Sequence, residues 1–234
     1  IGLALVGAVK GYRTIIIMPD SVSEERRKLI HHYGAELILI HDDNNIGECI
    51  DECLQTAMRM AEEDPNVFVP QQFINPANPQ VHRSHTGKEI LEQVDGPIHG
   101  FCSGIGTGGT ITGIGETLKA ANPDMEIWAV EPEHAAILSG GSIGSHLQMG
   151  IGDGVIPDIL NQNIYQDIYI VKDEEAIRTA QELASKEGIM CGISSGTNVA
   201  AAIQLAKKLG EDKTVVTVLP DTAERYFSTP LFED

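Results

Sequence analysis

A glycine-rich segment carries the strongest chemical signal in the sequence. Residues 104–110 read Gly-Ile-Gly-Thr-Gly-Gly-Thr and stand between an expected strand and an expected helix. Successive glycine amides followed by a helix N-terminus can bind an anion through backbone N–H groups and the positive end of the helix dipole. A tight turn could also need glycine for its backbone angles alone. The four glycines and two threonine hydroxyls in seven positions favour a phosphate site over a simple turn.

The same glycines allow a second interpretation. Gly104, Gly106 and Gly109 satisfy the G-x-G-x-x-G spacing of dinucleotide-binding proteins. Glu131, at the end of the next expected strand, stands roughly where an acid would bind the ribose. Pro132 comes directly after it and argues against that role. An NAD-type dinucleotide site is therefore the alternative to a simple phosphate site.

The cysteines and histidines predict no metal centre. Cys49 and Cys53 lie four residues apart on one expected helical face, where core packing is favoured over a metal or redox pair. The four cysteines are too few and too scattered for a disulfide scaffold, which favours a reducing cytoplasm. The histidines form no spacing such as H-E-x-x-H. We expect no bound metal.

Composition and charge exclude further classes of protein. The 234 residues include 16 Lys+Arg and 34 Asp+Glu, which gives a formal net charge of −18. So acidic a chain repels polyanions, and nucleic-acid binding is not expected. No apolar run approaches the roughly 20 residues that span a bilayer. The sequence therefore predicts a soluble, cytoplasmic protein that binds neither nucleic acid nor membrane.

The elements that position the glycine-rich segment alternate between helix and strand. This alternation predicts an α/β fold with mostly parallel sheets covered by helices on both faces. Residues 139–154 interrupt it with six glycines and little periodicity, which predicts a long functional loop. The expected strands are 14–18, 37–40, 67–69, 98–102, 126–130, 168–171 and 214–219, and the main expected helices are 1–10, 21–34, 46–61, 87–94, 110–121, 173–186 and 197–209. A capping box at Ser21 and Glu24 would open the second helix.

Six segments occur in the order seen in one enzyme family. They are 71–79 (QQFINPANP), 104–113 (GIGTGGTITG), 138–141 (LSGG), 150–152 (GIG), 192–196 (GISSG) and 224–229 (ERYFST). From end to end the chain resembles the O-acetylserine sulfhydrylase, or cysteine synthase, family. The resemblance implies a pyridoxal-phosphate enzyme of fold type II with a tryptophan-synthase-β-like fold and two three-layer α/β domains. Its implied reaction replaces the acetate of O-acetylserine with sulfide to give L-cysteine.

The resemblance also assigns residues to the cofactor pyridoxal 5'-phosphate. Ser194 matches the residue that hydrogen-bonds the pyridine nitrogen, although the sequence alone favours a cap or turn role for it. The implied phosphate-binding residues agree with the anion site predicted from the glycines. They are Gly106, Thr107, Gly108, Gly109 and Thr110.

For the substrate, the resemblance points to two loops. Gln72 matches a glutamine that helps to bind the substrate carboxylate, and Gly150 and Gly152 match a mobile loop at the mouth of the active site. Asp153 departs from the family, because a small residue is usual there. The substrate preference is therefore the property that the resemblance fixes least.

The catalytic lysine of the family has no counterpart in the sequence. Pyridoxal-phosphate enzymes need a lysine that holds the cofactor and, in this family, moves the substrate α-proton. The chain reads as N-terminally truncated, because Ile1 to Ala4 match the residues that come after the lysine segment and a substrate-binding loop in relatives. None of the nine lysines has the family context. We expect the chain alone to be inactive.

The expected organisation has two domains with the cofactor between them. Residues 1–75 would be the remainder of a smaller N-terminal domain, and residues 76–234 a larger cofactor-binding domain. The resemblance implies a homodimer and an association with serine acetyltransferase. A non-catalytic binding relic that keeps only the phosphate site is the alternative of a different class.

Overall fold

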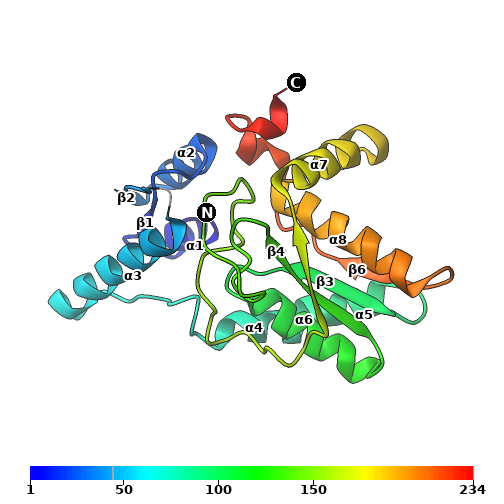
Figure 1. Ribbon diagram of the computed structural model, residues 1–234. Coiled ribbons are helices and arrows are strands. Elements are labelled where there is room, and N and C mark those ends of the chain that lie inside the picture. Colours follow the sequence, from blue (N-terminus) through cyan, green and yellow to red (C-terminus); the bar gives the residue numbers. More distant parts are fainter. Residues whose placement is uncertain (44, 234) are drawn as a thin grey trace.

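The computed structural model describes residues 1–43 and 45–233, in which helices and parallel strands alternate as the sequence predicts (Figure 1). Within these residues, the helices include none with both the length and the apolar character needed to cross a membrane. The strands form two separate parallel sheets. The glycine-rich segment belongs to the larger one.

The larger sheet has four parallel strands in the order β5-β4-β3-β6. The carboxyl ends of parallel strands meet at one edge of a sheet, which is where ligands bind in open α/β folds. Central strand β4 is buried along six of its seven residues because helices cover both of its faces. The strands are β3 (Gly100–Gly104), β4 (Glu126–Pro132), β5 (Asp167–Val171) and β6 (Val215–Thr217).

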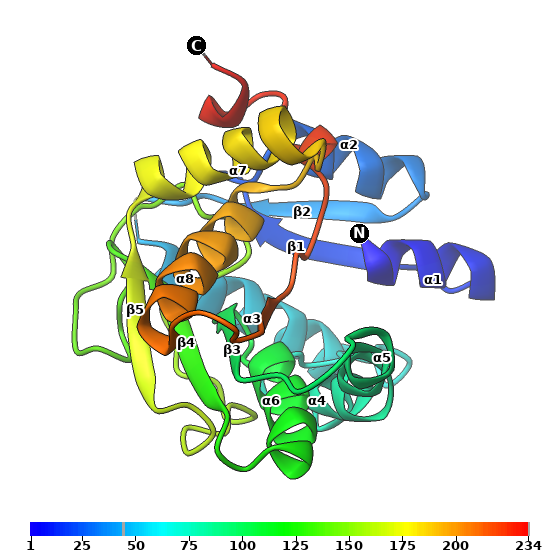
Figure 2. The same ribbon diagram turned by 90° about the vertical axis from the view of Figure 1, so that its right-hand side faces the viewer.

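Two groups of helices sandwich this sheet (Figures 1 and 2). Alternate side chains of a strand point to opposite faces, so Phe101 and Ile127 pack with the α6 side and Cys102 and Trp128 with the α8 side. The first group is α4 (Ala77–Val81), a π-helical turn η1 (His82–Thr86), α5 (Gly87–Gln93) and α6 (Gly109–Ala121). The second is α7 (Asp173–Glu187) and α8 (Ile193–Leu209). Residues 133–166, between β4 and β5, contain neither helix nor strand, which confirms the predicted loop.

The N-terminal part has its own small sheet and core. Strands β1 (Ile15–Pro19) and β2 (Glu36–Ile40) pair in parallel, and buried Ala4, Ile30 and Ala35 pack together beside them. Three helices accompany this sheet: α1 (Gly2–Lys10), α2 (Glu24–His32) and α3 (Ile46–Glu63). A separate sheet and core are consistent with a smaller unit here, and the boundary at residue 75 stays a prediction.

The C-terminal segment lies between the two parts of the molecule. Its short 3-10 turns η2 (Ala223–Tyr226) and η3 (Pro230–Phe232) run between α2 and α7 (Figure 1). The Ser23 hydroxyl at the start of α2 donates to the carbonyl of Arg225 at 2.7 Å. Arg26 forms an ion pair with Asp221 at 3.4 Å and donates to the Tyr226 hydroxyl. These contacts attach α2 to the larger part.

Three local predictions were wrong. Residues 67–69 form no strand, because no other strand within the described residues pairs with them, and Phe68 is 79% exposed. The capping box at Ser21 does not form, because the Ser21 hydroxyl donates to Asp42 instead and α2 begins after Ser23. Helix α8 begins at Ile193 rather than Thr197, which places Ser194 inside its first turn.

Candidate functional site

The glycine-rich segment connects the end of β3 to the start of α6. Gly108 caps the helix in the left-handed region, at φ +77°, where glycine is favoured over residues with a side chain. In the described part of the chain, the amides of Gly106, Thr107, Gly108 and Thr110 donate to no protein acceptor. The loop therefore offers several N–H groups beside the positive end of the α6 dipole.

Close packing against the Gly150 backbone and the Asn78 side chain explains why this loop needs glycine. A Cβ atom at Gly106 would lie 2.6 Å from the carbonyl oxygen of Gly150, and one at Gly109 would lie 2.0 Å from Oδ1 of Asn78. Real Cβ atoms essentially never approach other heavy atoms below 3.0 Å. Glycine is thus required here by contact as well as by backbone angle.

Asn78 links the predicted substrate residue to this loop. Its Nδ2 donates to the Gln72 carbonyl and to the Thr107 hydroxyl, each at 2.9 Å. The backbone of Gln72 therefore lies one side chain away from the loop, although the Gln72 side chain itself has no hydrogen bond in the described residues. The sequence pattern includes Asn78 in segment 71–79 but indicates no role for its side chain.

The predicted mouth loop lies directly on the glycine-rich segment. The Gly152 amide donates to the carbonyl of Ile105 at 2.8 Å, and His146 Nε2 lies 3.2 Å from the Gly152 carbonyl. Gly150 and Gly152 have φ values of +95° and +69°, so both need the freedom of glycine. The structure thus brings together Gly106, Gly150 and Gly152.

Asp153 places a carboxyl group beside Gly106, where the two loops meet. Its Oδ2 lies 3.3 Å from the position that a Cβ atom would take at Gly106. Burial raises the pKa of Asp153 to about 6. The residue that departs from the family pattern is therefore an acid that changes charge near neutral pH beside the anion site.

Ser194 lies in the first turn of α8 and is 4% exposed. Its hydroxyl has no hydrogen-bond partner within the described residues. One turn later, Asn198 accepts a hydrogen bond from the amide of Gly104 at 2.7 Å, which holds the start of α8 against the end of β3. The predicted helix-cap role is wrong, because Gly192 is the N-cap residue. The hydroxyl is available to a ligand.

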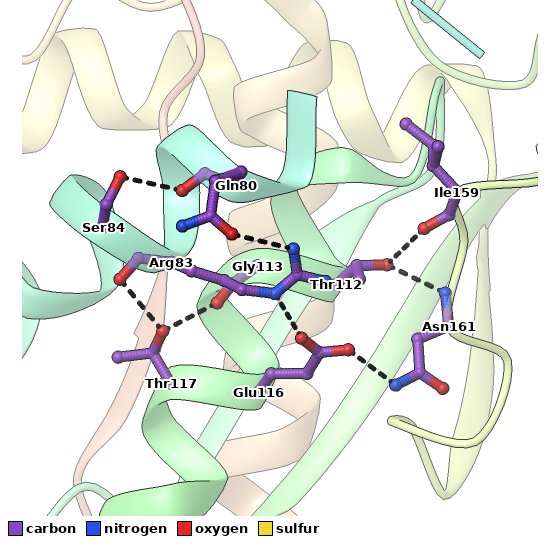
Figure 3. A network of polar contacts seen from close by, with 9 residues as sticks. All are labelled: Gln80, Arg83, Ser84, Thr112, Gly113, Glu116, Thr117, Ile159 and Asn161. Carbon is purple, nitrogen blue, oxygen red and sulfur yellow. Dashed lines mark hydrogen bonds and ion pairs between the residues drawn. The ribbon is translucent and has the colours of Figure 1, made fainter. Parts of the chain in front are cut away.

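Thr110 and α6 are held from the opposite side. The Thr110 hydroxyl lies 3.4 Å from Nε2 of His82, so only its backbone amide faces the anion site without a partner. A polar network anchors the next turns of α6 to η1 and to the loop before β5 (Figure 3). In it, Arg83 pairs with Glu116 at 2.5 Å, and Asn161 donates to the same carboxylate at 2.8 Å. Burial opposes ionisation of Glu116, and the Arg83 and Asn161 hydrogen bonds outweigh it and hold the pKa below its usual range.

The dinucleotide alternative fails at Glu131. This residue is 2% exposed, and its carboxylate accepts hydrogen bonds from the amides of Leu138 and Ser139 at 2.7 and 3.1 Å and from the Ser139 hydroxyl at 2.9 Å. A carboxylate occupied in this way cannot bind a ribose. The acid stabilises the loop after β4 instead.

The cysteines and lysines take ordinary structural positions. All four cysteines are free and buried, which confirms the predicted core role of Cys49 and Cys53. No cluster of metal-ligating side chains occurs among residues 1–43 and 45–233. Eight of the nine lysines are exposed and Lys119 is partly buried in α6, so none extends into the glycine-rich segment.

The candidate site combines a loop of unpartnered amides at the start of α6 with a buried hydroxyl in the first turn of α8. Unpartnered amides at a helix N-terminus can bind a phosphate, and the Ser194 hydroxyl on α8 can pair with a polar atom of a ligand. Fold and site together are typical of α/β proteins that bind a phosphate-containing ligand at the carboxyl edge of a parallel sheet.

Comparison with known proteins identifies the family to which the chain belongs. Residues 1–221 match the family model described as "Pyridoxal-phosphate dependent enzyme", and the chain belongs to that family. Its cofactor is pyridoxal phosphate, and its fold is that of the fold type II members.

Three relatives illustrate the similarity. The chain is 48% identical to a cysteine synthase of Staphylococcus aureus over 233 residues. The matched region covers 99% of this chain and 74% of the relative. A cysteine synthase structure from Entamoeba histolytica matches with a TM-score of 0.90 at 38% identity, over 99% of this chain and 68% of the other. An O-acetylserine dependent cystathionine beta-synthase from Helicobacter pylori matches with a TM-score of 0.92 at 33% identity, over 98% and 74%.

Proposed function

We propose that the protein is a cysteine synthase, which replaces the acetate of O-acetylserine with sulfide to give L-cysteine. The observation that carries this proposal is the convergence of the 104–110 loop, the 150–152 segment and Ser194 at one edge of the sheet. The identity of 48% to the S. aureus cysteine synthase supports the same reaction.

Within this reaction the chain's residues would bind and orient the reactants. The amides of residues 106–110 would hold the cofactor phosphate, and the Ser194 hydroxyl would meet the pyridine nitrogen as a neutral partner. Bound pyridoxal phosphate supplies an electron sink for charge that develops at the substrate α-carbon. Gln72 would bind the substrate carboxylate, and Gly150 and Gly152 would border the entrance. A neutral partner such as the Ser194 hydroxyl would leave the ring nitrogen unprotonated, which would favour β-elimination.

The assembly and location are proposed on the same basis. We infer a homodimer, an association with serine acetyltransferase and a cytoplasmic location, as the family resemblance implies. The formal charge of −18 is consistent with a partner that is not a nucleic acid. Light scattering of the purified protein, alone and mixed with serine acetyltransferase, tests both associations.

The activity assay uses the full open reading frame that encodes this chain. Purified protein with pyridoxal phosphate, O-acetylserine and sulfide is expected to form L-cysteine, and the Ser194→Ala variant to form it at least tenfold more slowly. Thr56→Ala, a change on the outer helix α3, is the control and is expected to match the parent. Cofactor binding without any cysteine formation would contradict the proposed reaction while leaving the cofactor site intact.

A further inference from the structure

A fully buried glutamine lies next to the mouth loop and belongs to none of the predicted site residues. Gln148 is 0% exposed. Its Nε2 donates to the Val171 carbonyl at 3.0 Å and to Asp173 Oδ1 at 2.8 Å. Its Oε1 accepts from the Thr197 hydroxyl at 2.7 Å. The side-chain amide therefore joins the end of β5, the start of α7 and the first turns of α8.

The backbone around Gln148 is fixed from the same side. The Leu147 amide donates to the second carboxylate oxygen of Asp173 at 2.8 Å, and the Gln148 amide donates to Nδ1 of His146 at 3.2 Å. Asp173 thus accepts from two consecutive residues, one through its backbone and one through its side chain. This pattern fixes both the position and the direction of the chain as it enters the mouth loop.

The fixed end leads directly to the site. The Ile151 amide donates to the Gln148 carbonyl at 3.4 Å, and the next amide, of Gly152, donates to Ile105 at 2.8 Å. At the other end of the junction, Thr197 lies three residues after Ser194 in the same helix. Gln148 therefore forms hydrogen bonds both to the mouth loop and to α8, the helix that carries Ser194.

We propose that Gln148 is a positioning residue, which sets the 150–152 segment at a fixed distance from the cofactor loop and from α8. The proposal deepens the function proposed above and rests on it for its kinetic consequence. Gln148 acts through Gly150 and Gly152 rather than by touching the substrate.

The chemistry of the junction requires an amide. Two acceptors, Val171 and Asp173, face Nε2, and one donor, the Thr197 hydroxyl, faces Oε1. A carboxylate in place of the amide would put two acceptors and a like charge against it. An apolar side chain of similar length would leave buried polar groups without partners. Both changes should release the mouth loop while the rest of the sheet stays formed.

The experiment compares Gln148→Met with Gln166→Met in the full-length protein. Gln166 also binds two backbone groups, but at the start of β5, away from the site. Hydrogen exchange at the Ile151 and Gly152 amides is expected to become at least tenfold faster in Gln148→Met and to stay unchanged in Gln166→Met. The KM for O-acetylserine is expected to rise about tenfold in Gln148→Met, with kcat changed less than threefold.

A charge-swapped pair provides a second arm. Gln148→Glu is expected to speed exchange in the same way. Adding Asp173→Asn should restore at least half of the protection, because the new amide at position 173 can donate to the new carboxylate at position 148. Unchanged exchange at Ile151 and Gly152 in both single variants would overturn the positioning role. If the exchange result holds but no variant or parent forms cysteine, the proposed function fails and the structural role of Gln148 stands.

Discussion

The absence of a side chain at Gly106 allows two loops of the candidate site to pack closely. Its neighbour is a backbone carbonyl, that of Gly150, 2.6 Å from the position of a Cβ atom. A side chain could rotate away, but a carbonyl held in a loop cannot. Glycine at this position therefore determines how closely the two loops approach.

We predict that Gly106→Ala weakens pyridoxal-phosphate binding at least tenfold, which corresponds to about 1.4 kcal/mol. The added methyl group would push the 150–152 segment away and distort the amides that face the phosphate. Gly2→Ala is the control, because nothing lies within 4 Å of its Cβ position. Absorbance titration with the cofactor measures both variants, and equal affinities would show that the two loops do not depend on each other.

Asp153 gives a prediction about pH. Its folded pKa of about 6 lies above the value of about 3.9 for an unfolded chain, so the folded state binds the proton more tightly. Burying the carboxylate therefore costs stability as the pH rises from about 4 through 6, and the cost is about 3 kcal/mol above pH 7. Asp153→Asn should be more stable than the parent by about that amount at pH 8 and equal to it near pH 3. Urea unfolding at both pH values tests this, and a difference that does not change with pH would contradict it.

The sequence indicates the glycines of the candidate site more directly than the contacts that place them. Glycines at 104–110 are a local pattern, and their backbone meaning does not depend on the rest of the fold. Asn78 and Gln148 act through partners 29 and 49 residues away, Thr107 and Thr197. No local pattern marks such residues, because an isolated asparagine or glutamine is typical of an exposed loop.

Among the elements, α2 depends on contacts that its own sequence does not contain. The Arg26 guanidinium meets Asp221 and lies over the Tyr226 ring, 4.9 Å from its centroid. Both charged side chains of the ion pair are only 16% exposed. One carboxylate oxygen of Asp221, Oδ1, is already buried without a hydrogen bond. The other oxygen, Oδ2, accepts from the Tyr226 hydroxyl at 2.7 Å and pairs with Arg26, so Arg26 supplies the positive charge that compensates this buried carboxylate.

We predict that Arg26→Ala lowers the free energy of unfolding by about 3 kcal/mol, because it leaves Asp221 buried without a cation. Arg13→Ala is the matched control. Its ion pair with Glu36 is 75% and 53% exposed, so solvent screens it and its loss should change the free energy of unfolding far less than the loss of Arg26. Urea unfolding curves give both values. Equal small losses would mean that the contact between α2 and the C-terminal segment contributes little.

Element boundaries agreed with the sequence where the signal was local and departed from it where tertiary contacts decided. Gly11 ends α1 in the left-handed conformation at φ +72°, as a terminal glycine predicts. Ser21 matches the capping pattern, but its hydroxyl donates to Asp42 on a neighbouring loop instead of capping the helix. Residues 67–69 have β-forming side chains but no partner strand within the described residues, and side-chain preference alone does not make a strand.

For the whole molecule, the alternation of helices and strands was enough to predict parallel sheets with helices on both faces. It could not predict that the C-terminal turns would lie between α2 and α7, because that contact joins residues about 200 positions apart, such as Ser23 and Arg225. The site draws on the glycine-rich loop, the mouth loop and α8, and the C-terminal segment joins α2 to the part that carries them. Ligand binding should therefore stabilise the whole fold rather than a single loop.

We expect this fold to hold pyridoxal phosphate chiefly by its phosphate group. The most direct test is thermal unfolding of the purified chain with pyridoxal phosphate, with pyridoxal, which has no phosphate, and with a nicotinamide dinucleotide. We predict that pyridoxal phosphate raises the unfolding temperature by several degrees, that pyridoxal raises it much less, and that the dinucleotide has no effect. Stabilisation by the dinucleotide alone, or equal stabilisation by pyridoxal and pyridoxal phosphate, would show that the phosphate group does not hold the cofactor in this fold.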